Sequence, residues 1–205
     1  GVPSKMWVPA LAAIAVGVPA MNVVIALNQN IEATGALAPL IDKLRTMEES
    51  ATAMIEIMQG GGSWSDLLMN VLIIGVAAGV AEELFFRGAL QRLLASGGVN
   101  IHASIWISAI VFSAVHMQFF GFVPRMLLGA YFGYLLYWSG SIWLPAAAHA
   151  LNNTLYVAFQ WLYLREGTPD ITIDNLGIGS TWPTAAASLI ATFLLITYLH
   201  KKRRY

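Results

Sequence analysis

Long apolar runs separated by short polar breaks dominate the chain. A helix needs about 20 consecutive, mostly apolar residues to cross the hydrocarbon core of a bilayer. Six segments approach this length and composition, and they predict membrane spans at 6–27, 66–94, 101–118, 122–138, 142–164 and 183–200. Glycine and serine clusters, which favour turns, lie between several of these runs. We therefore expect an all-α fold, a polytopic transmembrane helix bundle of about six spans.

Two longer connections interrupt this pattern. Segment 28–64 places apolar residues at helical spacing among charged ones, which is typical of an amphipathic helix at the membrane interface. A partly ordered loop fits this segment equally well. Segment 165–182 is rich in polar and turn-forming residues and predicts an exposed loop. Since no internal repeat divides the sequence, residues 1–205 are interpreted as a single integral membrane domain.

Composition supports the membrane assignment and excludes several classes of protein. Hydrophobic residues make up 58% of the chain, charged residues only 11%, and the mean hydropathy is +0.66. A soluble domain carries about 25% charged residues, so this chain cannot cover a water-facing surface of its size. The low charge also excludes a disordered chain and a nucleic-acid binder. We therefore expect the lipid bilayer to be a partner of the chain. The absence of cysteine excludes disulfides, thiol catalysis and thiolate-held metals.

The distribution of basic residues predicts an orientation in the membrane. Four consecutive bases, Lys201 to Arg204, follow the last predicted span, and positive residues favour the cytoplasmic side. An even number of spans then places the N-terminus, with Lys5, on the same side and both long connections outside. Together with the short loops, this predicts an integral protein of the bacterial inner (plasma) membrane with a cytoplasmic C-terminus.

The acidic residues single out one pair for chemistry. Between Leu67 and Arg165 the chain contains only two acidic residues, the adjacent Glu82 and Glu83. Ionisable groups inside a membrane are costly and indicate function, and two neighbouring carboxylates disfavour each other's ionisation. Arg87 lies four residues after Glu83 on the same helix face, where it can neutralise and orient that carboxylate. Glu82 is then free for a different role. The alternative is a helix end at the interface, held by basic side chains.

Two histidines and an asparagine are the other candidates. His116 lies in the third predicted span and His149 in the fifth, one turn before Asn153. At about 1.5 Å rise per residue, these side chains and Glu82 fall within one slab of the membrane, so a shared polar cavity is possible. A carboxylate and a neutral histidine can activate water as a general base, and a histidine with an amide can stabilise an oxyanion. Such a set can hydrolyse a peptide without a covalent intermediate.

The same residues form three ordered motifs, each on a predicted membrane helix. The motifs are EExxxR at 82–87, FxxxH at 112–116 and HxxxN at 149–153. As an ordered set they resemble the CPBP family, also called the Abi family, which contains CAAX proteases and bacteriocin-processing enzymes. The resemblance covers about residues 66–164, the motif-bearing core.

The resemblance implies a glutamate-type intramembrane endopeptidase that needs no cofactor and no metal. Its motif positions imply that Glu82 and His116 activate the water. They further imply that His149 and Asn153 stabilise the oxyanion, with Glu83 and Arg87 as supporting residues. The substrate would be a peptide or protein that is membrane-associated or, as in the eukaryotic relatives that cleave after a prenylated cysteine, prenylated.

Two other readings of the sequence remain open. Two histidines and a glutamate can also bind zinc, which would make the protein a membrane metalloprotease. Alternatively, buried glutamate and histidine residues serve as proton relays, and a catalytically silent relative could act as a membrane scaffold or immunity protein. Arg125, near the outer end of the fourth predicted span, is interpreted as an interfacial anchor in preference to a substrate contact.

Overall fold

The computed structural model describes residues 4–31, 35–167 and 172–203, and their regular secondary structure is entirely helical. This confirms the predicted all-α fold. The helices outside the motif-bearing core are α1 (Ser4–Gln29), η1 (Gly35–Leu37), α2 (Ala38–Gln59), η4 (Gly179–Thr181) and α9 (Trp182–Lys201). Within the core, one long helix at 64–96 is followed by α6 (Ile101–Ala114), α7 (Phe122–Ser139) and α8 (Trp143–Glu166).

Helices form at all six predicted span positions. Among the described residues, three helical stretches are long and apolar enough to cross a membrane, namely Ser4–Gln29, Trp64–Ser96 and Gly179–Lys201. Helix α6 is apolar but shorter. That α6, α7 and α8 also span the membrane, which would give six spans, therefore remains a prediction. Arg204 of the basic tail and residues 168–171 of the predicted exposed loop lie outside the described residues.

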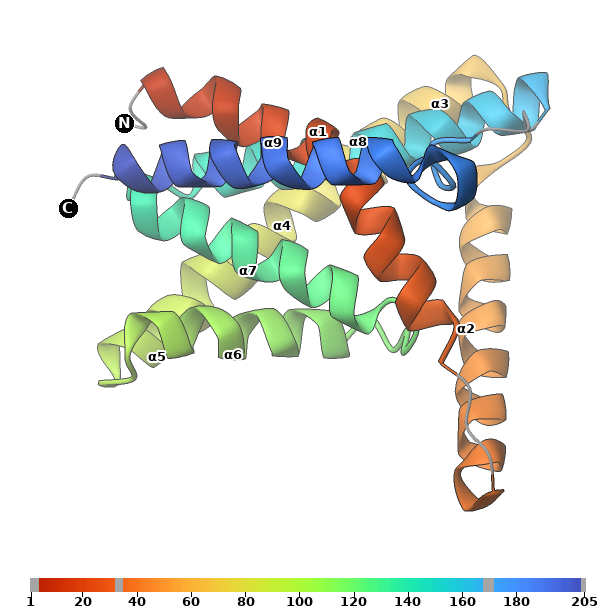
Figure 1. Ribbon diagram of the computed structural model, residues 1–205, viewed down its shortest axis with the longest axis horizontal. Helices are drawn as coiled ribbons and strands as arrows, with labels where there is room; N and C mark the ends of the chain where they lie inside the picture. Colours follow the sequence, from red (N-terminus) through yellow and green to blue (C-terminus); the bar gives the residue numbers. More distant parts are fainter. Residues whose placement is uncertain (1–3, 32–34, 168–171, 204–205) are drawn as a thin grey trace.

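Segment 28–64 contains a well-formed helix. Helix α2 occupies Ala38–Gln59 and runs crosswise to α6 and α9, whose axes follow the long dimension of the molecule (Figure 1). Most of its side chains are exposed, including the apolar Leu40, Met54 and Ile57. A helix across the bundle with an exposed apolar face is what an interfacial position would require. That position itself remains a prediction.

Helix α1 is bent in the middle, where it packs on α9 (Figure 1). Pro19 lies inside the helix, lacks a backbone N–H and clashes with the preceding turn. Ser188 of α9 compensates for this break. Its hydroxyl accepts a hydrogen bond from the Ala20 N–H at 3.2 Å and donates one to the Val16 carbonyl at 2.6 Å. The two terminal helices are therefore joined by polar contacts at the kink.

The buried apolar core lies between α1, α7, α8 and α9. It consists of Met6, Ala10, Ile14, Phe132, Leu135, Trp138, Leu144, Ala148 and Leu199. The outward face of α9 is also apolar but exposed, as shown by Leu189, Ile190, Phe193 and Leu194. A continuous exposed apolar face is expected where a helix meets lipid. The core fixes α7 and α8, and the long 64–96 helix packs against both of them.

Candidate active site

The helix at 64–96 carries the carboxylate pair and contains two π-helical stretches. Its consecutive parts are α3 (Trp64–Asn70), the π-helical η2 (Val71–Ala78), α4 (Gly79–Glu83), the π-helical η3 (Leu84–Gln91) and α5 (Arg92–Ser96). Wide π turns are rare and occur frequently at functional sites. Here they flank the short α4, which ends with Glu82 and Glu83. Each wide stretch has a carbonyl that accepts a side-chain hydrogen bond, Ile74 from Asn153 and Phe86 from Ser108.

Glu83 and Arg87 form an ion pair inside the bundle. Arg87 Nη1 lies 2.7 Å from Glu83 Oε1, and neither side chain has any exposed surface. The four-residue spacing places both on one helix face, as the sequence predicts. The guanidinium also packs over the Phe112 ring, with 4.5 Å from Cζ to the ring centroid. A fully buried charge needs such compensation, because its transfer out of water is costly.

Two glycines of α7 allow the long helix to approach closely. Arg87 Nη2 donates to the Gly129 carbonyl at 2.8 Å, and Gln91 Nε2 donates to the Gly133 carbonyl at 3.3 Å. A Cβ atom at position 129 would lie 3.1 Å from Arg87 Nη2, and one at position 133 would lie 2.8 Å from Gln91 Oε1. Both side chains therefore reach α7 because these positions carry no side chain.

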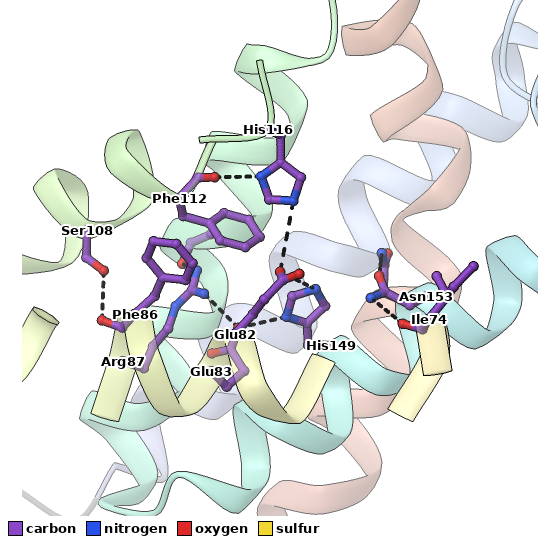
Figure 2. A network of polar contacts seen from close by, with 12 residues as sticks. Ile74, Glu82, Glu83, Phe86, Arg87, Ser108, Phe112, His116, His149 and Asn153 are labelled. Carbon is purple, nitrogen blue, oxygen red and sulfur yellow. Dashed lines mark hydrogen bonds and ion pairs between the residues drawn. The ribbon is translucent and has the colours of Figure 1, made fainter. Parts of the chain in front are cut away.

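Glu82 faces two histidines, one on α8 and one in the segment between α6 and α7 (Figure 2). Its Oε2 atom lies 3.7 Å from His149 Nε2 and 4.0 Å from His116 Nε2. Glu82 and His116 are each 30% exposed, whereas Glu83 is fully buried. The two adjacent carboxylates thus have different environments. Glu82 is accessible and faces two imidazoles, and Glu83 is enclosed by Arg87 and His149.

Each histidine is held through its other ring nitrogen. His116 Nδ1 lies 2.7 Å from the Phe112 carbonyl, and His149 Nδ1 lies 2.8 Å from Glu83 Oε1. A carbonyl and an ionised carboxylate accept hydrogen bonds but cannot donate them, so both Nδ1 atoms carry hydrogen. Phe132 stacks on the His149 ring with centroids 4.7 Å apart. These contacts fix both rings with Nε2 directed at Glu82.

The position of His116 corrects the sequence prediction. The third span was predicted to run from 101 to 118, with His116 inside it, but α6 ends at Ala114. The chain then turns, and Met117 adopts a positive φ of 55°, which is unusual for a residue other than glycine. His116 therefore lies just beyond the helix, in the turn before α7. Backbone strain of this kind persists only where surrounding contacts enforce it.

Residues distant in the sequence hold this turn in place. Asn28 Nδ2 at the end of α1 donates to the carbonyls of Phe119 and Phe120. Glu48 Oε2 of α2 accepts the Phe120 N–H at 2.7 Å, and Arg45 packs over the Phe120 ring. The turn that carries His116 thus depends on α1 and α2. Neither Asn28 nor Glu48 belongs to a motif, so the sequence does not indicate that either residue supports the site.

Asn153 lies beside this cluster but has no direct hydrogen bond to it (Figure 2). Its Nδ2 donates to the Ile74 carbonyl at 3.1 Å, and its Oδ1 accepts from Asn152 Nδ2 at 3.3 Å. These two contacts fix the orientation of the amide. The structure therefore brings together Glu82, Glu83, Arg87, His116 and His149 by direct contacts, and it places Asn153 one turn from His149 on α8.

The helix spacing also depends on residues that sequence analysis missed. Gly75 and Gly79 face α8, where a Cβ atom would lie 2.6 Å from Thr154 Oγ1 and 3.0 Å from the Ala150 nitrogen, respectively. The glycines of α7 at 129 and 133 have the same four-residue spacing. Small residues at this spacing allow membrane helices to approach closely, and this signal is readable in the sequence. Gln91, one turn after Arg87, carries no comparable signal.

A catalytic zinc site requires three converging protein ligands. Within the described part of the chain, no group of three or more histidine, aspartate or glutamate side chains is arranged to hold a metal ion. In the cluster, both Nδ1 atoms are engaged with protein acceptors and Glu83 Oε1 with Arg87.

Comparison with known proteins adds one finding. The sequence model of the family described as Type II CAAX prenyl endopeptidase Rce1-like matches residues 64–155. Residues 64–155 belong to the Rce1-like family. This confirms the family resemblance inferred from the motifs, and the Rce1-like segment begins and ends close to the predicted core, with all three motifs inside it. No curated protein and no solved structure matches the chain.

The match assigns residues 64–155 to a class of proteins. The Rce1-like family is a family of membrane-embedded CAAX-type proteases, so a peptide or protein substrate and a bilayer environment follow at family level. The apolar helices long enough to span a membrane agree with this environment. The family description does not specify which residues perform the chemistry.

Proposed function

We propose that the chain is an intramembrane endopeptidase of the CAAX type in which Glu82 acts on a water molecule. The observation that carries the proposal is that one oxygen of the accessible Glu82 faces Nε2 of both His116 and His149. The enclosed Glu83 supports this arrangement through its contact with His149 and Arg87. The family match supports the class of hydrolase, and the geometry supports the residue roles that the motifs imply.

Glu82 and His116 are suited to hold and activate the water. With hydrogen on Nδ1, neutral His116 has a lone pair on Nε2, directed at Glu82 Oε2 4.0 Å away. A water that donates to two acceptors at about 2.8 Å from each spans a gap of about 4 Å. Such a water has its own oxygen lone pairs free for attack on a carbonyl carbon. Glu82 then takes the proton as general base.

His149 is suited to stabilise the oxyanion as an imidazolium. Because Nδ1–H is used for Glu83, only the doubly protonated ring has an Nε2–H to donate. Two carboxylates, Arg87 and a charged His149 together have no net charge, which favours this state in a low-dielectric site. Asn153 donates one amide hydrogen to Ile74 and retains a second for the oxyanion.

The proton returns to the leaving group in the last step. Attack of the activated water gives a tetrahedral intermediate, whose C–N bond breaks when the departing nitrogen gains a proton. Protonated Glu82 can supply it directly or through His116 Nε2, which faces the same oxygen. The products are a carboxylic acid and an amine, and Glu82 is again ionised. No covalent enzyme intermediate forms.

The test is hydrolysis of an internally quenched peptide by protein purified in detergent. The substrate ends in a farnesylated cysteine followed by three residues. Glu82→Gln keeps the side-chain volume but removes the base, so cleavage should fall to background while the melting temperature is retained. Glu49→Gln, on exposed surface of α2, is the matched control and should cleave normally. Full activity of Glu82→Gln would refute the assignment, and loss of activity on chelation, restored by zinc, would favour the metalloprotease reading.

A further inference from the structure

Arg125 is a basic residue near the site that the proposed chemistry does not use. It lies in the first turn of α7, four residues after Gly121 at the end of the turn that carries His116. The sequence favours an interfacial anchor for this arginine. An anchor extends its side chain toward water and lipid headgroups. The structure shows a different conformation.

The Arg125 side chain folds back over the turn. Its Nη2 donates to Gln118 Oε1, and a Cβ atom at position 121 would lie 3.0 Å from the same nitrogen. Gly121 thus leaves the space that the guanidinium occupies. The fold-back places the charged group against the segment that carries His116, on the protein side of the helix.

One nitrogen of this guanidinium is buried without an acceptor. Among the described residues, Arg125 Nη1 has no hydrogen-bond partner and no carboxylate forms an ion pair with Arg125. The Glu48 carboxylate, which attracts it at longer range, is engaged with the Phe120 N–H. A buried donor without an acceptor is expensive and is expected to take one from a ligand.

The chemistry of the guanidinium and its neighbours indicates what kind of ligand would fit. Arg125 is close enough to Glu82 and His116 to interact with both electrostatically. A guanidinium presents parallel N–H groups that match a carboxylate in geometry and charge. In CAAX-type cleavage three residues follow the cleaved bond, and extended chain covers about 3.3–3.6 Å per residue, so the terminal carboxylate lies about 10 Å from the reacting carbonyl.

We propose that Arg125 binds the C-terminal carboxylate of the peptide substrate. The inference rests on the proposed endopeptidase function and assigns a specificity determinant to it. Binding of the carboxylate supplies the acceptor that Nη1 lacks and fixes the distance between the chain end and the cleaved bond. The chain would therefore select substrates by their free C-terminus, and Glu82 would meet the peptide bond three residues before it.

The test compares two quenched peptides that differ only at the C-terminus, one a free acid and the other a carboxamide. Wild-type protein should prefer the acid about tenfold or more in kcat/KM, mainly through KM, as expected for a charge-assisted contact. Arg125→Gln should abolish this preference because it weakens binding of the acid peptide. Arg125→Lys should retain part of the preference. Arg92→Gln removes an exposed charge of α5 and should leave the preference intact.

A binding measurement separates this inference from the proposed function. The acid and amide peptides are titrated against Glu82→Gln protein and against the same protein with Arg125→Gln. Tighter binding of the acid peptide, lost with Arg125→Gln, supports the inference even where no peptide is cleaved. Equal binding of both peptides by Glu82→Gln overturns it. An equal loss for both peptides in Arg125→Gln also overturns it, because the arginine would then act on the fold of the turn.

Discussion

Nδ1 of His149 lies 2.8 Å from Oε1 of Glu83, so the fully buried Glu83 holds the hydrogen on Nδ1 and orients the imidazole whose Nε2 faces Glu82. This relation makes the adjacent glutamates unequal. Glu82 is available to water and substrate, whereas Glu83 is committed to Arg87 and His149. A carboxylate that orients a histidine is a recurring arrangement in hydrolases, where it fixes the tautomer and stabilises the imidazolium.

Replacement of Glu83 by Gln should therefore lower kcat more than it changes KM. The amide keeps the volume and one hydrogen-bond acceptor, but it no longer stabilises a charged His149. Loss of one oxyanion donor costs about 100-fold to 1000-fold in kcat, and we expect a decrease in this range. Steady-state kinetics over a range of pH, measured well below the melting temperature, provide the check. A Glu83→Gln protein with wild-type kcat would show that His149 does not act as an imidazolium.

Replacement of Arg87 by Met should destabilise the fold. Both members of the ion pair are fully buried, so the variant leaves the Glu83 charge without its closest partner. Breaking a buried pair costs about 3–5 kcal/mol. Equilibrium unfolding in detergent should show this decrease, whereas Arg92→Met, at an exposed position of α5, should remain within about 0.5 kcal/mol of wild type. Similar stabilities for the two variants would contradict the importance of the pair.

A methyl group at Gly129 or Gly133 should also destabilise the bundle. A Cβ atom at 129 would lie 3.0 Å from Phe112 Cδ1, and one at 133 would lie 2.8 Å from Ile105 Cγ2. Overpacking of this kind costs about 1–3 kcal/mol. Gly88→Ala is the matched control, because its Cβ would meet only the Glu83 carbonyl, at 3.7 Å. Thermal unfolding should separate the variants, and Gly88→Ala should be neutral or stabilising, since alanine favours helix by about 1 kcal/mol.

Removal of the Glu48 side chain should reduce catalysis without removing any group from the cluster. Glu48→Ala deletes the acceptor of the Phe120 N–H and loosens the turn that positions His116. We expect kcat to fall about tenfold, the value of one charge-assisted hydrogen bond, with KM little changed. Glu48→Gln retains an acceptor and should recover part of the rate. Glu49→Ala, at the exposed neighbouring position, is the control, and an equal loss in that variant would argue against this role.

The helices and the Glu83–Arg87 pair could be predicted from the sequence because both depend on local spacing. Apolar runs of sufficient length form helices in any membrane bundle, and residues four apart on a helix always share a face. The three motifs were identified through their resemblance to a known family. Their assignment to one site required that the segments carrying them lie side by side.

The end of α6 could not be predicted, and the reason is physical. Apolar residues continue past Ala114 through Val115, Met117 and Phe119, so the sequence shows no break. The turn is imposed by Asn28 and Glu48, which come from helices more than 60 residues earlier in the chain. Likewise, no local pattern indicates that Glu82 faces both histidines while Glu83 contacts only one. Such selections depend on tertiary packing.

The contacts of Arg87 with Gly129 and of Gln91 with Gly133 have a consequence for how the bundle assembles. The two donors are four residues apart, and so are the two glycines. If one helix moved along the other by one turn, about 5.4 Å, a donor side chain would therefore face a glycine again. Only one of these alignments keeps Glu83 beside His149. The charged arginine and the neutral glutamine make the alternative alignments unequal in energy, which favours the alignment that holds Glu83 beside His149.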